Sequence, residues 1–221
     1  MIDSKPISEV LNVDCLEYMR SLPDKHFDLC IADPPYGLDK KSTHGRGKLK
    51  NRIINRDSIH DWDVVPSEEV FSEMMRVSKN QIIWGGNYFP LPPTRCFVCW
   101  DKVQPWENFS QCEFAWTSFD YPAKMFRFDN RTTQKIHPTQ KPSELYAFLL
   151  QRFAKEGDTI FDPFLGSGSS RISAYKMGFD FVGCEIDERF FNLQQERFDR
   201  ECNGIIAKES DGTRIIQQSL F

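Results

Sequence analysis

Apolar and polar positions along the chain follow two periods, one typical of strands and one typical of helices. The pattern predicts strands over residues 10–13, 27–32, 81–84, 96–100, 113–119, 159–161 and 181–184. It predicts helices over residues 16–22, 67–77, 143–153, 169–177 and 188–200. Because strands and helices alternate outside the middle of the chain, we expect a doubly wound α/β fold with a mostly parallel, seven-stranded sheet. The two middle strands are expected to form a β-hairpin.

The length of the chain fits one domain of this kind. Its 221 residues are enough for an α/β domain with a full core, but few for two catalytic domains joined by a linker. We therefore expect residues 1–221 to form a single domain with a polar loop over 39–61, a hairpin region with candidate target-recognition loops over 90–135, and a C-terminal tail over 204–221. The composition, 40% hydrophobic and 27% charged, is that of an ordinary globular protein.

The sequence indicates a soluble protein of the cytoplasm. It contains no run close to the ~20 apolar residues of a membrane span, and its first residues lack the apolar core of a signal peptide. Its seven cysteines, an odd number scattered along the chain, fit reduced thiols better than a disulfide framework. Cys96 and Cys99 have CxxC spacing, but without a second such pair we expect them to be core residues rather than metal ligands.

Positive charge is concentrated in one segment. The net charge is −4, yet the stretch 40–56 holds seven basic residues and no acid, which leaves 21 basic and 32 acidic residues elsewhere, a net charge of −11. We expect this stretch to contact the phosphates of a nucleic acid, with a solvated loop as the alternative. Its basic residues are Lys40, Lys41, Arg46, Lys48, Lys50, Arg52 and Arg56.

A glycine-rich turn follows one of the late strands. It runs from Asp162 to Gly168 and includes Gly166, and its glycines allow a ligand to approach the backbone at the carboxyl edge of a sheet. Glu185 ends the next strand, where a carboxylate can accept hydrogen bonds from ribose hydroxyls. Arg171 occupies the position of the third glycine of a dinucleotide site, which favours a ligand without phosphate, such as S-adenosylmethionine, over NAD. A tight turn without a ligand is the alternative.

The tetrad Asp33-Pro34-Pro35-Tyr36 ends another strand. A base amine is a poor nucleophile, because its lone pair is delocalised into the ring, so methyl transfer to it needs acceptors that align the amine and stabilise the charge developing on nitrogen. The Asp33 carboxylate and the Pro34 carbonyl can each accept one amine hydrogen, Pro35 stiffens the turn, and Tyr36 can stack on the base. A base in a duplex must be flipped out to reach such a pocket. A turn without chemistry is the alternative for the tetrad alone.

These motifs resemble those of a known enzyme family. The tetrad is similar to the catalytic motif of N6-adenine and N4-cytosine DNA methyltransferases, residues 162–168 to their cofactor loop, and residues 137–142 to the motif that precedes this loop in the beta-ordered subgroup. The resemblance implies the Rossmann-like fold of S-adenosylmethionine-dependent methyltransferases. It also implies cofactor contacts from Asp14, Cys15, Asp33, Thr139, Lys141, Asp162, Phe164, Gly166, Ser167, Gly168 and Glu185.

The family resemblance divides the cofactor among these residues. It places Asp14 and Cys15 at the adenine, Glu185 at the ribose, and Thr139 and Lys141 at the amino-acid end. Asp14 can also serve as the N-cap of the helix that follows it, and a solvated side chain is the alternative for Lys141.

The resemblance further implies a site-specific methyltransferase that acts on double-stranded DNA. Adenine N6 is the expected target, because Asp33 stands where the N4-cytosine enzymes commonly have Ser. The alternatives are cytosine N4, then RNA or a protein amide, or a non-catalytic DNA-binding protein of the same fold. A C5-cytosine mechanism is excluded, since it typically uses a cysteine after a proline and the chain has no Pro-Cys pair. The short chain leaves little room for a target-recognition domain and indicates a solitary enzyme of the phage or restriction-modification type, monomeric or homodimeric.

The last five residues form a candidate binding motif. They resemble the short peptide by which bacterial DNA-associated enzymes bind the replicative sliding clamp, with Gln217, Leu220 and Phe221 as anchors. Gln218 stands where Leu is usual in that peptide. A tail folded onto its own core is the alternative.

Overall fold

The structure is a computed structural model that describes residues 5–37, 64–105, 110–129, 135–137, 139–208 and 214–216. The basic segment 40–56 and the candidate clamp-binding residues Gln217, Leu220 and Phe221 lie outside these ranges, so what was predicted for them stays a prediction. Within the described ranges, no helix combines the length and the apolar character needed to cross a membrane.

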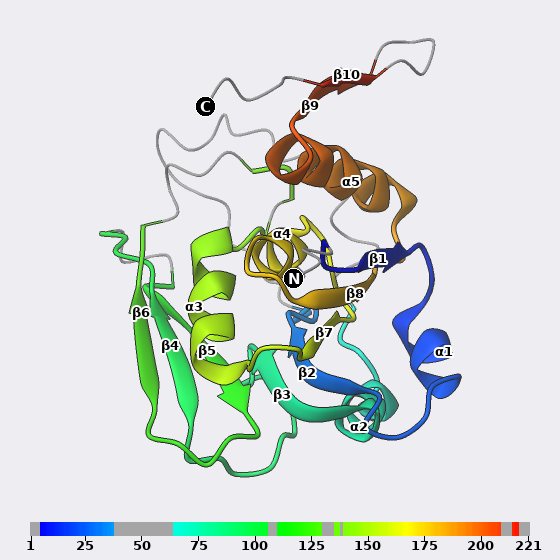
Figure 1. The fold of residues 1–221 in the computed structure, drawn as a ribbon. Coiled ribbons are helices and arrows are strands. Elements are labelled where there is room, and N and C mark those ends of the chain that lie inside the picture. Colours follow the sequence, from blue (N-terminus) through cyan, green and yellow to red (C-terminus); the bar gives the residue numbers. More distant parts are fainter. Residues whose placement is uncertain are drawn as a thin grey trace.

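The described residues form a mixed sheet with helices packed on both faces (Figure 1). The main sheet has eight strands in the order β1-β8-β7-β2-β3-β5-β4-β6, and β9 and β10 form a separate antiparallel pair. The strands are β1 (Ser8–Leu11), β2 (Phe27–Ala32), β3 (Ser78–Trp84), β4 (Phe97–Asp101), β5 (Cys112–Thr117), β6 (Lys124–Arg127), β7 (Thr159–Asp162), β8 (Asp180–Cys184), β9 (Ile205–Lys208) and β10 (Arg214–Ile216). The helices are α1 (Cys15–Arg20), α2 (Glu68–Val77), α3 (Ser143–Phe153), α4 (Ser169–Lys176) and α5 (Glu188–Cys202).

This architecture confirms the predicted doubly wound α/β fold. The strands from β1 to β3 in the sheet order pair in parallel, and the predicted hairpin is β4 with β5, which pair antiparallel. The predicted count of seven strands is wrong, because β6 has only four residues and joins the sheet by backbone pairing with β4 rather than through a clear pattern of its own. The pair β9–β10 lies within the segment that was expected to be a tail.

The central strand β2 buries both of its faces. Its side chains alternate, so that Leu29 and Ile31 belong to the core under α3 and α4, whereas Cys30 and Ala32 belong to the core under α1 and α2. All four residues are at most 1% exposed. Burial of such apolar side chains from two sides, at ~25 cal/mol per Å² of apolar surface, fixes the strand rigidly between the helical layers.

The parallel strands end at one edge of the sheet, and this edge positions the site. There β2 leads into Asp33, β7 ends at Asp162, and β8 leads into Glu185. The chain order reverses between β2 and β7, because β3 lies beyond β2 while β8 and β1 lie beyond β7. Open α/β sheets bind ligands in the crevice at such a reversal. The fold therefore brings the tetrad and the glycine-rich turn together although they are far apart in the sequence.

Candidate active site

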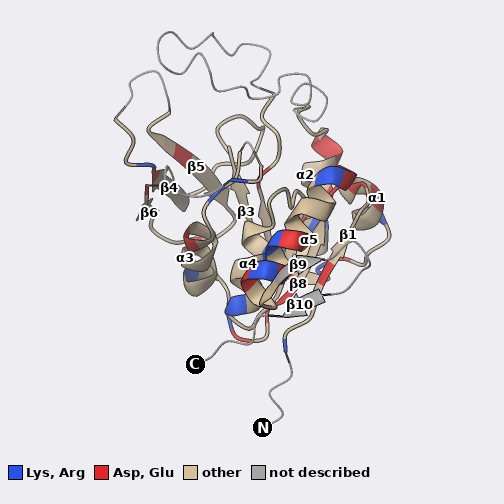
Figure 2. Ribbon diagram, turned by 90° about the horizontal axis from the view of Figure 1, so that it is seen from above, with Lys and Arg blue, Asp and Glu red and all other residues tan. Residues whose placement is uncertain are grey.

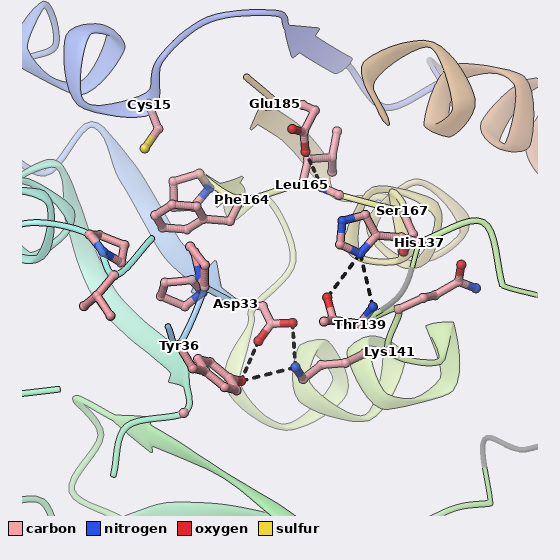
Figure 3. A pocket seen from close by; sticks show the side chains of 18 of the residues that line it. Cys15, Asp33, Tyr36, His137, Thr139, Lys141, Phe164, Leu165, Ser167 and Glu185 are labelled. Carbon is pink, nitrogen blue, oxygen red and sulfur yellow. Dashed lines mark hydrogen bonds and ion pairs between the residues drawn. The ribbon is translucent and has the colours of Figure 1, made fainter. Parts of the chain in front are cut away.

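A cavity of about 970 Å³ opens at this edge of the sheet. Its volume lies near the upper end of the range for small-molecule sites, which is roughly 300–1,000 Å³. Residues at the ends of β2, β7 and β8, the start of α1 and the β4–β5 hairpin all contribute to its wall. The wall contains the whole tetrad and most of the predicted cofactor residues: Asp14, Cys15, Asp33, Pro34, Pro35, Tyr36, Thr139, Lys141, Phe164, Gly166, Ser167 and Glu185. Figure 3 labels eight of them, including Asp33, Lys141 and Glu185.

Two predicted cofactor residues, Asp162 and Gly168, lie behind the wall instead of in it. The Asp162 carboxylate is 1% exposed and accepts hydrogen bonds from the Phe164 N–H at 2.9 Å and the Ser170 hydroxyl at 2.5 Å. Burial raises the pKa of Asp162 to about 7. Gly168 has a φ of 73° and caps α4, and a Cβ there would lie 3.2 Å from Gln194. Both residues thus stabilise the conformation of the glycine-rich turn without lining the cavity.

Glu185 ties the glycine-rich turn to the end of β8. Its carboxylate accepts a hydrogen bond from the Gly166 N–H at 2.7 Å through Oε2, and one from the Asp187 N–H at 2.9 Å through Oε1. Burial raises the pKa of Glu185, although these backbone donors oppose the effect. Each carboxylate oxygen has a second lone pair, so the group can still accept hydrogen bonds from a ribose diol.

The wall on this side of the cavity suits an adenosine. Phe164, Ile186 and Phe190 supply apolar surface next to the Glu185 carboxylate. The Asp14 carboxylate caps α1, where its Oδ1 accepts hydrogen bonds from the N–H groups of Leu16 at 2.7 Å and Glu17 at 3.2 Å, which confirms the predicted N-cap. Burial and the nearby Asp14 raise the pKa of Cys15 to about 12, so its thiol is neutral. A flat apolar ring with a hydroxylated sugar matches this set of groups.

At the other side of the cavity, both oxygens of the Asp33 carboxylate already accept hydrogen bonds (Figure 3). The Tyr36 hydroxyl donates to Oδ1 at 2.7 Å, and the Lys141 ammonium donates to Oδ2 at 2.5 Å. Burial raises the pKa of Asp33, and the adjacent ammonium opposes this. Tyr36 follows the two prolines that end β2, so the tetrad folds its own aromatic ring back over its acid.

Lys141 lies at the acid of the tetrad, whereas the family resemblance placed it at the amino-acid end of the cofactor. Its side chain is 3% exposed. Burial lowers the pKa of Lys141, but the carboxylates of Asp33 and Glu113 outweigh burial and raise it above its ordinary value. Lys141 is therefore a buried cation that depends on carboxylate partners. Thr139 lines the cavity, with its hydroxyl 3.1 Å from His137 Nδ1.

Glu113 and Lys102, neither of which was predicted as a site residue, extend this charged cluster. Glu113 Oε2 lies 3.1 Å from the Lys141 ammonium, and Oε1 forms an ion pair with Lys102. Burial raises the pKa of Glu113, yet the two lysines outweigh it and lower the pKa to about 2. The available signal was an acid at the start of an otherwise apolar strand, but the partner of that acid could not be read from the sequence.

His137 also borders the cavity. Its ring packs edge-on against Phe190, with centroids 4.2 Å apart. Burial and the charge of Lys141 lower the pKa of His137 to about 4, so the imidazole is neutral at physiological pH. In the parts of the chain that the structure describes, no group of three or more His, Cys, Asp or Glu side chains is arranged to hold a metal ion.

Gly85 allows Tyr36 to take its position, and its replacement provides a test. Gly85 has a φ of 69°, and a Cβ there would lie 2.3 Å from Cε1 of the Tyr36 ring. Gly85→Ala is therefore expected to displace the ring and to lower kcat by roughly 100-fold, because misplacement by about 1 Å has effects of this size. Single-turnover methylation measures the loss. The affinity for the cofactor, measured by calorimetry, should stay unchanged.

Gly157 provides the matched control for this variant. It has a φ of 85°, and a Cβ there would meet nothing within 4 Å. Gly157→Ala thus introduces comparable backbone strain without a clash. If the two variants lost activity equally, backbone strain rather than the position of Tyr36 would be responsible.

Comparison with known proteins decides the family. The model of the DNA methylase family N6_N4_Mtase matches residues 83–196, which is just over half of the chain. The chain belongs to this family of DNA methylases. As a DNA methylase it uses S-adenosylmethionine as its cofactor, in agreement with a cavity wall whose apolar side chains and Glu185 carboxylate suit an adenosine.

Individual relatives of this DNA methylase are distant. It is 25% identical to the type II methyltransferase M2.MboI of Moraxella bovis, over 84% of this chain and 85% of that protein. Among solved structures, the putative DNA modification methylase TTHA0409 of Thermus thermophilus has a TM-score of 0.58 at 20% identity, covering 90% of this chain and 97% of that one. The cytosine-N4-specific PvuII DNA methyltransferase has a TM-score of 0.53 at 13% identity, with coverages of 88% and 94%. At these identities the two structures support the fold alone.

Proposed function

We propose that this DNA methylase moves a methyl group from S-adenosylmethionine to the N6 amine of a flipped adenine in double-stranded DNA. One observation carries the proposal: the tetrad and the turn around Gly166 open into the same cavity. A cofactor held between Glu185 and the turn can direct its methyl group at an amine held by the Asp33 carboxylate and the Pro34 carbonyl. These acceptors would stabilise the positive charge that develops on the nitrogen.

The cavity offers a separate surface for the base. The Tyr36 ring is stacked on the exposed Tyr88 ring, with centroids 5.1 Å apart and an interplanar angle of 25°. This spacing is too short for a base to enter between the two rings, because stacked aromatic planes lie ~3.5–4 Å apart on each side of an inserted ring. A flipped base would stack on the cavity side of Tyr36 or displace Tyr88.

Adenine is preferred over cytosine as the proposed target because Asp33 occupies the first position of the tetrad, where the N4-cytosine enzymes commonly have Ser. Cytosine N4 is the main alternative. Incubation of the protein with unmethylated DNA, RNA and protein in the presence of labelled S-adenosylmethionine separates the substrate classes. Mass spectrometry of the digested DNA then distinguishes N6-methyldeoxyadenosine from N4-methyldeoxycytidine. Label in N4-methyldeoxycytidine alone would overturn the choice of adenine, and no label in DNA would overturn the proposal.

Contact with DNA phosphates is assigned to the basic segment 40–56. Figure 2 shows basic and acidic residues on both α2 and α5, and the arginines there form ion pairs such as Arg76 with Glu73 and Arg197 with Glu201. On both of these helices acids outnumber the basic residues, so neither presents excess positive charge. The segment 40–56, with seven basic residues and no acid, is the better candidate for the DNA interface.

Replacement of Lys48, Lys50 and Arg52 by Gln tests this assignment. We expect the variant to bind duplex DNA more weakly. We also expect the slope of log affinity against log salt concentration to become less negative by about 2–3, because each phosphate contact contributes ~0.9 to its magnitude. Fluorescence anisotropy at several salt concentrations measures the affinity and its salt dependence. The matched control neutralises three residues outside the cavity wall, Lys155, Lys176 and Arg200. Equal slopes for the triple variant and the wild type would remove the segment from the interface.

The C-terminal residues keep their proposed role as a docking peptide for a sliding clamp. Gln217, Leu220 and Phe221 carry this proposal through the sequence alone. A monomer or a homodimer, and an origin in a phage or a restriction-modification system, are likewise proposals from the sequence.

A further inference from the structure

The proposed amine acceptor is already occupied in the structure. Asp33 accepts a hydrogen bond from Tyr36 through Oδ1 and one from Lys141 through Oδ2. A target amine would have to donate a hydrogen bond to one of these same oxygens. The Lys141 ammonium poses a second difficulty. A cation at this position would repel the positive charge that develops on the base nitrogen during methyl transfer. Binding of the amine and the reaction itself both favour movement of Lys141 away from Asp33.

Lys141 has a second carboxylate within reach. Glu113 Oε2 lies 3.1 Å from its ammonium. This oxygen is fully buried and receives no hydrogen bond of good geometry from the described residues, so it retains capacity as an acceptor. The Trp84 ring also lies beneath the ammonium, with its centroid 5.3 Å away. Because the Lys141 side chain is only 3% exposed, its release from Asp33 costs least when a nearby protein carboxylate receives the ammonium.

The β4–β5 hairpin holds Glu113 in place for this exchange. Glu113 pairs in register with Trp100, and Lys102, which directly follows β4, forms an ion pair with Glu113 Oε1. The Lys102 N–H also donates to the Gln111 carbonyl at 2.9 Å, which extends the ladder between the two strands. The cluster contains two acids and two lysines, so a shift of Lys141 from Asp33 to Glu113 creates no net buried charge.

We propose that Glu113 is a positioning residue that takes over Lys141 when the target amine binds to Asp33, and that Lys102 holds Glu113 for this role. The exchange replaces one hydrogen bond to Asp33 by another and involves no covalent step. The proposal rests on the proposed amine methylation and specifies how the acceptor becomes available for it.

Glu113→Gln tests the exchange through its pH dependence. With a neutral amide at this position Lys141 stays on Asp33, so kcat/KM for duplex DNA at pH 7.5 should fall by roughly tenfold or more, while the Kd for S-adenosylmethionine stays within about twofold. The loss should shrink as the pH rises. Removal of one of the two carboxylates that raise the pKa of Lys141 lowers that pKa, and a neutral Lys141 releases Asp33.

The other groups around Lys141 do not account for such a recovery. Tyr36 and Tyr146 have pKa values raised by burial, and His137 has a pKa lowered by burial to about 4, so none of them changes charge between pH 7.5 and about 9.5. Loss of the Glu113 charge removes one cause of the raised pKa of Asp33, so the substitution does not favour protonation of that acid. The rate ratio of variant to wild type at each pH cancels effects of pH on the DNA and the cofactor.

Two further variants complete the experiment. Glu113→Asp keeps the charge but draws the carboxylate back from Lys141, so its activity should lie between those of the wild type and Glu113→Gln, and it carries the same pH test if the Gln variant does not fold. Glu69→Gln removes an acid that pairs with Arg20 on the exposed surface and should match the wild type. Wild-type activity in Glu113→Gln, or a loss that does not change with pH, would overturn the exchange. If the wild type itself did not methylate DNA, the proposed function would fail instead.

Discussion

Asp33→Ala is expected to lower kcat for methyl transfer to DNA by ~10³-fold or more, while the Kd for S-adenosylmethionine stays within about threefold of the wild-type value. The Asp33 carboxylate lies in the cavity wall at the end of β2, and its removal takes away one of the two proposed acceptors of the target amine. The lost acceptor acts mainly on the base and its transition state rather than on the cofactor. Single-turnover methylation measures the rate, and calorimetry measures the cofactor affinity.

The structure indicates that this variant can fold. Lys141 keeps a carboxylate partner, since Glu113 Oε2 lies 3.1 Å from its ammonium. Asp28→Ala is the matched control, because Asp28 lies on β2, the strand that leads into Asp33, forms an ion pair with Lys79 and does not line the cavity. Both variants should show a cooperative thermal transition. Activity of Asp33→Ala within ~10-fold of the wild type would defeat the assignment of Asp33 as the amine acceptor.

Glu185→Ala is expected to raise the Kd for S-adenosylmethionine by ~10–100-fold, since a hydrogen bond to a charged group contributes about 1.5–3 kcal/mol. The variant loses the acceptor proposed for the ribose hydroxyls. It also leaves the N–H groups of Gly166 and Asp187 without the carboxylate that holds the turn. Calorimetric titration with the cofactor measures the change. Glu188→Ala, three residues along the chain and outside the cavity wall, serves as the control and should bind normally.

The charge of Glu185 adds a pH dependence to cofactor binding. Burial raises the pKa of Glu185, with the backbone N–H groups opposing it, so the group takes up a proton at a higher pH than an exposed glutamate does. The ionised form is the better acceptor for hydroxyl donors, and cofactor affinity should therefore fall as the pH decreases through this raised pKa. Glu185→Gln should bind more weakly and lose this dependence. An equal pH profile in the two proteins would assign the effect to another group.

Local patterns predicted most of the secondary structure closely. The predicted strand 27–32 and the predicted helix 143–153 have the observed bounds, because each carries a clear apolar pattern; Asp33 follows the strand and Pro142 precedes the helix. β6 was missed and β9–β10 was taken for part of a tail. Strands this short are stabilised by the backbone of a neighbour, which a local window of sequence does not contain.

The candidate site likewise contains residues that the sequence identified and residues that only the structure revealed. The tetrad and the turn around Gly166 were recognisable because each is a contiguous motif whose residue types carry the chemistry. Asp162 belongs to such a motif, yet only the packing shows that its carboxylate points into the turn rather than the cavity. Glu113 and Lys102 carry no motif at all, and their importance arises from contacts between separate strands.

The sequence by itself thus determined the fold class, the chemistry of an amine methyltransferase and the two motifs that carry it, since these depend on local periodicity and on contiguous residue types. Only the tertiary structure decided which partners occupy the acid of the tetrad. Lys141 reaches Asp33 from 108 residues away, and Glu113 approaches Lys141 from the β4–β5 hairpin. Pairing of buried charges depends on distances of a few ångströms between distant segments, and the complete packed sheet is needed to set those distances.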